Sequence, residues 1–187
     1  ETFGVLYPVL HEQMFSFFFD AHLMVIIFFI LSGDALSSSF YKTSKNISTI
    51  RIALARYFRL TFLIAFSCGI SYVFMKFQLN KNVEAALLIH REDWLGEFLN
   101  FAQSLSGAIR YMFHDVYFNH SAVKSYNPFL WTMSIELSGS VLVFINILIL
   151  SVLSSRRQIE VLMGEFSFFC LFGNYLALFP LGMALGW

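Results

Sequence analysis

The chain has 187 residues, of which 58% are hydrophobic and 13% are charged, whereas a typical soluble domain has about 45–50% apolar and about 25% charged residues. A soluble fold of this size would expose much of that apolar surface to water. The composition therefore excludes an ordinary soluble domain and predicts an integral membrane protein. Twelve basic and twelve acidic residues cancel, which gives no indication of a nucleic-acid partner.

Four segments, in chain order, have the roughly 20 mostly apolar residues that a membrane-spanning helix needs. They are residues 14–33, 55–77, 128–153 and 161–187. Pro128 suits the first turn of the third helix, and Pro180 is expected to kink the fourth. The sequence predicts an all-α, polytopic transmembrane helix bundle with about four spans, forming one membrane domain over 1–187.

The connections between these segments differ in composition. Residues 34–54 and 154–160 are polar and basic, whereas 78–127 is long, mixed in character and too polar to span a membrane. Apolar residues at helical spacing within 83–118 predict one or two amphipathic helices, at the membrane interface or packed onto the bundle. Lysine and arginine in short loops favour the cytoplasmic side. We therefore expect a multi-pass protein of the cytoplasmic or plasma membrane, with 78–127 on the extracytoplasmic side.

Glu136 lies within the third apolar segment, where an ionisable side chain is costly and usually faces a cavity or a partner. Thr132 and Ser140 precede and follow it by four residues, which places all three on one helix face. This polar stripe is predicted to point away from lipid. A functional carboxylate and a structural carboxylate paired with a neighbouring helix both remain possible from the residues alone.

Arg56 and Arg59 are three residues apart at the start of the second apolar segment. Two guanidinium groups there could bind phosphates or carboxylates through bidentate hydrogen bonds, or they could contact lipid headgroups as a positive-inside flank. The five histidines show no metal-binding spacing. Cys68 and Cys170 lie in apolar runs and form no disulfide or metal motif, so no metal site is predicted.

Three motifs occur together and in order: "VIIFFILSGDALSS" at 25–38, "RIALARYFRLTF" at 51–62 and "NPFLWTMSIELSGSVLVF" at 127–144. Together they resemble the membrane acyltransferase 3 family, whose members show an F-F-x-L-S-G signature, an R-x-x-R pair and a W-[ST]-x-x-x-E motif. The matching residues include Ser32 and Gly33, Arg56 and Arg59, and Trp131 and Thr132 with Glu136. Asp34 departs from the Phe or Tyr that usually follows the glycine.

The resemblance implies an O-acyltransferase that moves an acyl group, often acetyl, from cytoplasmic acyl-CoA to a carbohydrate hydroxyl. It implies a catalytic role for Glu136, donor binding by Arg56 and Arg59, and substrate contacts near Ser32, Gly33, Trp131 and Thr132. Acyl-CoA is then a donor substrate, no cofactor is bound, and the partners are the bilayer and the carbohydrate acceptor.

Family members have about ten helices, and the first carries an arginine and a histidine that this sequence does not match. We therefore expect this chain to be a partial domain and to be inactive by itself. Two alternatives predict different behaviour. A secondary transporter would use Glu136 as a proton or cation relay, and a non-catalytic membrane scaffold would use the polar groups only for helix packing.

Overall fold

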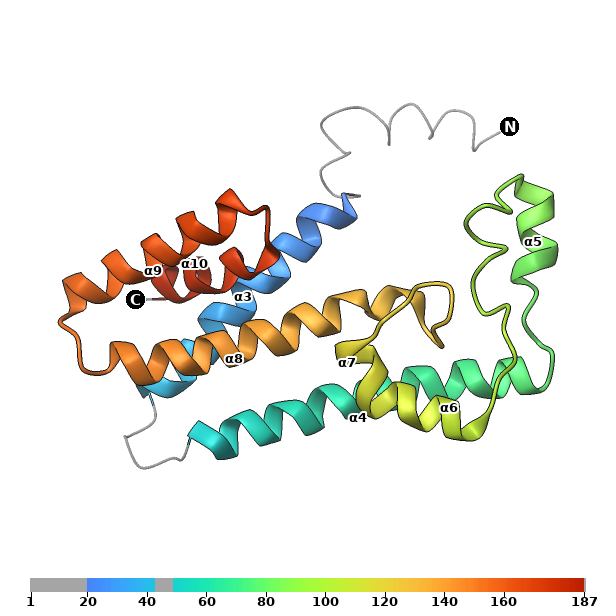
Figure 1. Cartoon of the computed structure of the whole chain (residues 1–187), viewed down its shortest axis with the longest axis horizontal. Coiled ribbons are helices and arrows are strands. Elements are labelled where there is room, and N and C mark those ends of the chain that lie inside the picture. The colour runs from blue at the N-terminus through green and yellow to red at the C-terminus, as the bar shows by residue number, and fades with distance from the viewer. Residues whose placement is uncertain (1–19, 43–48, 187) are drawn as a thin grey trace, which may run out of the picture. The chain divides into compact units, whose positions relative to one another are not determined.

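The computed structural model describes residues 20–42 and 49–186. About 75% of the chain is helical, and there is no strand among the described residues (Figure 1). This confirms the predicted all-α class. The chain divides into two compact units, one formed by residues up to 42 together with 147–187 and the other by 43–146. The single domain predicted over 1–187 stays a prediction.

Three helical segments are long and apolar enough to cross a membrane. They are Ala21–Ser38 within α3 (Ala21–Lys42), Arg51–Lys76 within α4 (Thr49–Lys76), and Pro128–Leu150, which comprises η2 (Pro128–Trp131) and α8 (Thr132–Leu150). They correspond to the first three predicted spans. Residues 14–19 of the first prediction lie outside the described residues. Pro128 begins a helical turn, as predicted.

The basic connection predicted over 34–54 is wrong over most of its length. Helix α3 continues through Gly33 to Lys42, and α4 already begins at Thr49; residues 43–48 lie outside the described part of the chain. The hydroxyl of Ser37 donates to the carbonyl oxygens of Gly33 and Asp34, at 3.0 Å each. Because short hydroxyl side chains can bond back to the preceding turn, a polar composition does not by itself end a helix.

The fourth predicted span, 161–187, is also wrong. Helix α9 (Ser155–Leu171) begins within the predicted basic turn, and the chain then reverses into η3 (Tyr175–Ala177) and α10 (Leu178–Leu185) (Figure 1). Gly173 has a φ of +59° at this reversal, a conformation that favours glycine. Pro180 lies in the first turn of α10 rather than at a kink, where its missing N–H costs no helical hydrogen bond.

The first unit depends on close approach of α3 and α10. Phe29 and Phe179 are fully buried, and their ring centroids are 5.5 Å apart. A Cβ atom on Gly33 would lie 3.0 Å from the Cα of Phe179, and one on Gly182 would collide with the backbone of Ile30. Glycines on both helices therefore let the two backbones meet, as small residues do in membrane helix pairs.

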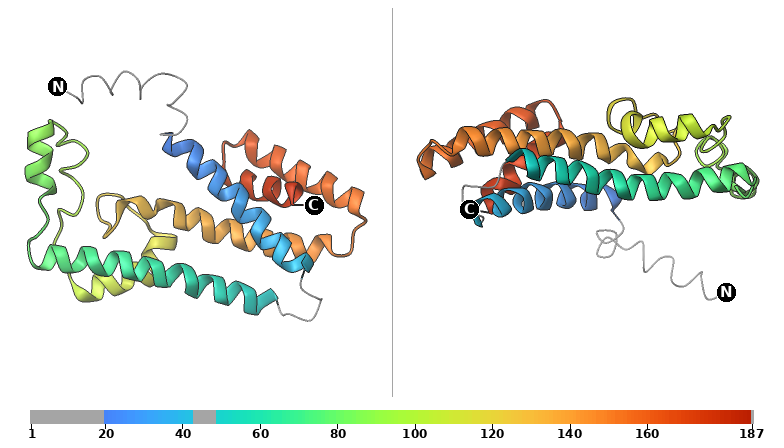
Figure 2. Two further views of the ribbon diagram at one scale, coloured as in Figure 1. Left: turned by 180° about the vertical axis from the view of Figure 1, so that it is seen from behind. Right: turned by 90° about the horizontal axis from the view of Figure 1, so that it is seen from below.

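In the second unit, α4 packs against a helical segment from the long connection (Figure 2). This segment comprises α6 (Leu105–Arg110), the π-helical η1 (Tyr111–Asp115) and α7 (Val116–Phe118). Buried side chains between them include Ile64 and Cys68 from α4 with Ala108, Tyr111 and Val116. A separate helix, α5 (Asn82–Ile89), precedes it. Helices therefore do form within the predicted range 83–118, but residues 90–104 between them are not helical; the helices of 105–118 pack back onto α4.

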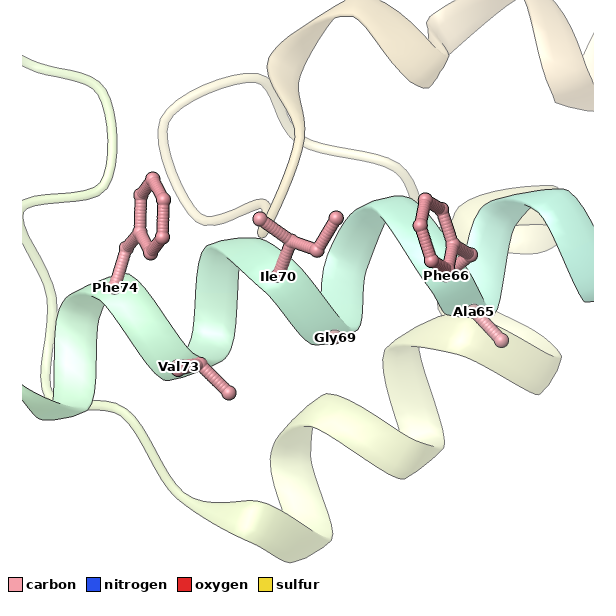
Figure 3. A pocket seen from close by; sticks show the side chains of 6 residues that line it. All are labelled: Ala65, Phe66, Gly69, Ile70, Val73 and Phe74. Atoms are coloured by element: carbon pink, nitrogen blue, oxygen red, sulfur yellow. The ribbon is translucent and has the colours of Figure 1, made fainter.

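One face of α4 carries a shallow apolar hollow of about 410 Å³ (Figure 3). Phe66, Ile70 and Phe74 form one row along the helix at a spacing of four residues. Small residues at 65 and 69 in the neighbouring row leave the space of the hollow beside it. A Cβ on Gly69 would have nothing within 4 Å. Such an exposed apolar face is unfavourable in water but suits the hydrocarbon of a bilayer.

We expect Gly33→Ala to destabilise the protein by about 1–3 kcal/mol, because the added methyl group would overpack the contact between α3 and α10. Gly164→Ala is the matched control, since a Cβ there would have nothing within 4 Å. Replacing this helical glycine should stabilise by about 0.5–1 kcal/mol. The free energy of unfolding in micelles measures both, and equal effects of the two substitutions would contradict the close contact at Gly33.

Candidate functional site

A buried ion pair joins α4 to α8 inside the second unit. Arg56 donates from Nη2 to Oε1 of Glu136, which lies 80 residues further along the chain. Their side chains are only 10% and 1% exposed. The carboxylate that is isolated in the apolar sequence of the third segment is therefore neutralised by a guanidinium group from the second.

Ser140 completes this arrangement. The Nε of Arg56 donates to the Ser140 hydroxyl at 2.6 Å, and that hydroxyl is also 2.6 Å from the backbone carbonyl of Glu136, to which it donates. Glu136 and Ser140 share the buried face that their spacing predicts, and Thr132 is half-buried one turn earlier. We call Arg56, Glu136 and Ser140 the charged cluster.

The pairing follows from the cost of burying charge. An isolated guanidinium or carboxylate in an apolar interior loses several kcal/mol of hydration, and only a hydrogen-bonded partner offsets that loss. Arg56 can serve both Glu136 and Ser140 because its guanidinium presents several N–H donors in a planar fork. Each partner therefore keeps the other stably buried, which fixes the register of α4 against α8.

Arg56 and Arg59 have different surroundings, although they lie one turn apart. Arg59 is exposed and makes no hydrogen bond or ion pair within residues 20–42 and 49–186. Arg56 is buried and engages Glu136 and Ser140. The two guanidinium groups thus do not form one exposed clamp. Phosphate binding stays a prediction for both, and Arg59 is the one whose charge is open to a ligand.

The other residues singled out by the motifs fall into two groups. Trp131 ends η2 and Thr132 begins α8, directly before the turn that carries Glu136. Ser32 and Gly33 belong to the other unit, where Gly33 is explained by the close approach of α10. Their predicted substrate contacts stay predictions.

Asn127 is a positioning residue that the sequence reasoning missed. Its Oδ1 accepts a hydrogen bond from the backbone N–H of Phe129 at 3.0 Å, which caps η2, and its Nδ2 donates to the hydroxyl of Ser67 on α4 at 2.7 Å. It therefore ties the start of the third span to α4. An asparagine directly before a helical proline is a recognisable N-cap signal.

A second polar cluster, also missed, lies in the long connection. The Tyr111 hydroxyl is 2.9 Å from Nδ1 of His120 and also donates to the carbonyl of Asn127 at 3.4 Å. Burial raises the pKa of the Tyr111 phenol and lowers the pKa of the His120 imidazole. Both groups are therefore neutral at neutral pH, and the contact acts as a structural hydrogen bond rather than an ion pair.

Within the described ranges no three His, Cys, Asp or Glu side chains are placed to hold a metal ion. Cys68 is buried and Cys170 is exposed, and both are free thiols. Comparison of the chain with models of protein families, with curated proteins and with solved structures finds no match. The acyltransferase resemblance therefore rests on its motifs.

We expect Arg56→Met and Glu136→Leu each to destabilise the protein by about 3–5 kcal/mol, because each leaves a buried charge unpaired. The double variant should recover most of that loss, since two apolar side chains need no partner. Unfolding measured for both singles and the double forms a double-mutant cycle.

The exposed pair Arg156 and Glu160 provides the control, with an Nε to Oε1 distance of 3.1 Å. Its equivalent cycle, Arg156→Met and Glu160→Leu, should show little coupling, because solvent screens surface pairs. Additive losses at Arg56 and Glu136 would contradict the buried pair.

Proposed function

We propose that this protein is a multi-pass membrane acyltransferase that transfers an acyl group, in the simplest case acetyl, from acyl-CoA to a carbohydrate hydroxyl. One observation carries the proposal. The R-x-x-R and W-[ST]-x-x-x-E motifs lie far apart in the sequence, and Arg56 of the first contacts Glu136 of the second. Two motifs of the resemblance thus share one buried cluster, as residues of a common site would.

The proposed reaction needs a positioned base and a bound thioester. The acceptor hydroxyl oxygen attacks the thioester carbonyl carbon, the carbon–sulfur bond breaks, and the hydroxyl proton passes through the base to the departing CoA thiolate. Glu136, oriented by Arg56 and Ser140, would position the base or the attacking hydroxyl. A fixed carboxylate in a low-dielectric interior makes strong charge-assisted hydrogen bonds, which suits this role.

The distribution of basic residues supports a cytoplasmic donor. If α3, α4 and the segment 128–150 cross the membrane in alternating directions, residues 43–48 and 151–154 lie on one side and 77–127 on the other. Arg51, Arg56 and Arg59 follow the first of these connections, and Arg156 and Arg157 follow the second. Positive residues favour the cytoplasmic side, where acyl-CoA would reach the exposed guanidinium of Arg59.

The same cluster could serve packing alone, because a hydrogen-bonded ion pair also holds two helices together. A proton relay is less consistent with this geometry, since a relay carboxylate must exchange protons while this one is held by Arg56. Activity measurements on variants that retain the fold separate these roles.

We expect Glu136→Gln to lower acyl transfer at least tenfold, because the amide removes the charge that orients the base or hydroxyl. The assay is release of CoA thiol from acetyl-CoA by the full-length protein in liposomes, with a carbohydrate acceptor. The double variant Arg56→Met with Glu136→Leu, which restores apolar packing, should remain inactive. The surface variant Glu160→Gln should behave as wild type. Wild-type turnover in the double variant would show that the cluster is purely structural.

Arg59→Gln should raise the KM for acetyl-CoA by roughly 10- to 100-fold with little change in kcat, because a charged hydrogen bond to phosphate contributes about 1.5–3 kcal/mol. Arg157→Gln, at another exposed arginine, is the matched control. Acetyl-pantetheine lacks the nucleotide phosphates, so wild type and Arg59→Gln should use it equally well. An unchanged KM for acetyl-CoA would contradict donor binding by Arg59.

A further inference from the structure

Beyond the charged cluster, the second unit contains a groove where α4 ends, where α5 begins and where residues 99–103 pass. It has a volume of about 460 Å³. Half of its ten lining residues carry side-chain amides, and none carries a charge. The amides belong to Gln78, Asn80, Asn82, Asn100 and Gln103. We call this the amide groove, and we infer that it binds an uncharged saccharide.

The amides of the groove are available to a ligand. Those of Gln78, Asn80, Asn100 and Gln103 make no hydrogen bond to any residue that the structure describes. Each offers both a donor and an acceptor. Sugar hydroxyls also donate and accept, so one amide can bind two of them. A cluster of such groups matches a polyhydroxyl compound better than it matches an ion.

Asn82 is held in a defined orientation. Its Nδ2 donates to the backbone carbonyls of Leu95 and Phe98, at 3.2 and 2.5 Å. Because both partners are carbonyl oxygens, the amide nitrogen must face them. Oδ1 then remains as an acceptor for a ligand hydroxyl. One amide is therefore preorganised, which lowers the entropic cost of binding.

Backbone strain occurs on both walls of the groove. Gln78 and Leu99 each have a φ of +54°. At the end of α4, Gln78 N–H donates to the carbonyl of Met75 and Leu79 N–H donates to that of Phe74, which is the Schellman pattern with Gln78 at the left-handed C′ position. Glycine is the usual residue there. A strained glutamine that lines a groove indicates a ligand role, since strain of this kind concentrates at functional sites.

The apolar lining is consistent with a sugar ring. Phe101 lines the groove, and its ring meets that of Tyr126 edge-on with centroids 5.2 Å apart. The ring is thus held in place and can present apolar surface to the C–H face of a saccharide. With no charged lining residue, the groove favours neutral sugars over anionic ones.

The groove is remote from the charged cluster. Arg56 and Met75 are 19 residues apart on α4, which is about 28 Å at 1.5 Å per residue. A ring in the groove therefore does not contact Glu136. A sugar ring bound there would be a distant unit of an extended glycan. That assignment rests on the proposed acyl transfer, whereas the inference that the groove binds a saccharide does not.

Ligand-observed NMR with the protein in lipid nanodiscs tests the inference, with cellobiose, maltose and N-acetylglucosamine as probes. Sugar-headed detergents are avoided because they would compete. We expect saturation transfer from at least one probe, with a Kd that does not change between 0.05 and 0.5 M salt, since neutral contacts are not screened. The double variant Asn80→Leu with Asn100→Leu should weaken binding at least tenfold. Asn119→Leu, at an exposed amide outside the groove, should not weaken it.

Substitution of Gln78 provides a second test, in which stability and saccharide binding should change in opposite directions. Gln78→Gly relieves the left-handed strain and should raise the melting temperature while it weakens saccharide binding; Gln78→Asn, which retains an amide and tolerates this backbone, should keep more of the binding. A stabilised Gln78→Gly variant with unchanged affinity would overturn the role of Gln78.

Absence of binding by all probes to wild type would overturn the inference and leave acyl transfer standing. Saccharide binding without any CoA thiol release by the full-length protein would overturn acyl transfer and leave the inference standing.

Discussion

The hydrogen-bonded pair of Arg56 and Glu136 is the interaction on which the second unit depends. Both side chains are buried among apolar helices, where neither charge would be stable alone. Their contact, with Ser140 as the third member, requires Arg56 to lie opposite Glu136. Only one register of α4 against α8 is therefore favourable. Apolar packing alone would specify that register less strongly, because lipid and neighbouring helices offer a helix face similar apolar surroundings.

Helix α4 organises the other features of this unit. Near its start it carries the charged cluster and the exposed guanidinium of Arg59, and at its end Gln78 forms one wall of the amide groove. The distance between them, about 28 Å along the axis, is close to the roughly 30 Å of a bilayer core. One helix thus carries Arg56 and Arg59 near its start and one wall of an uncharged groove at its end, an arrangement that would suit the proposed transfer from a cytoplasmic donor to a carbohydrate outside.

The residues determine the type of these elements more locally than they determine where the elements end. Apolar length alone located three helices that are long and apolar enough to cross a membrane, because about 20 apolar residues have few stable alternatives to a membrane helix. It misjudged residues 34–42, where Ser37 bonds back into α3, and 161–187, where the chain reverses near Gly173. Hydropathy averages over a window, whereas hydroxyl back-bonds and a left-handed glycine act at single residues.

The sequence by itself determined the helical class, the apolar spans and the polar face that carries Glu136 and Ser140, because period and hydrophobicity are local properties. Only the tertiary structure decided that Arg56, 80 residues away, supplies the counter-charge and that Arg59 does not. It also decided that Gly33 serves the contact with α10, and that amides from three chain segments line one groove. These outcomes depend on which distant residues meet, and a linear pattern does not contain that information.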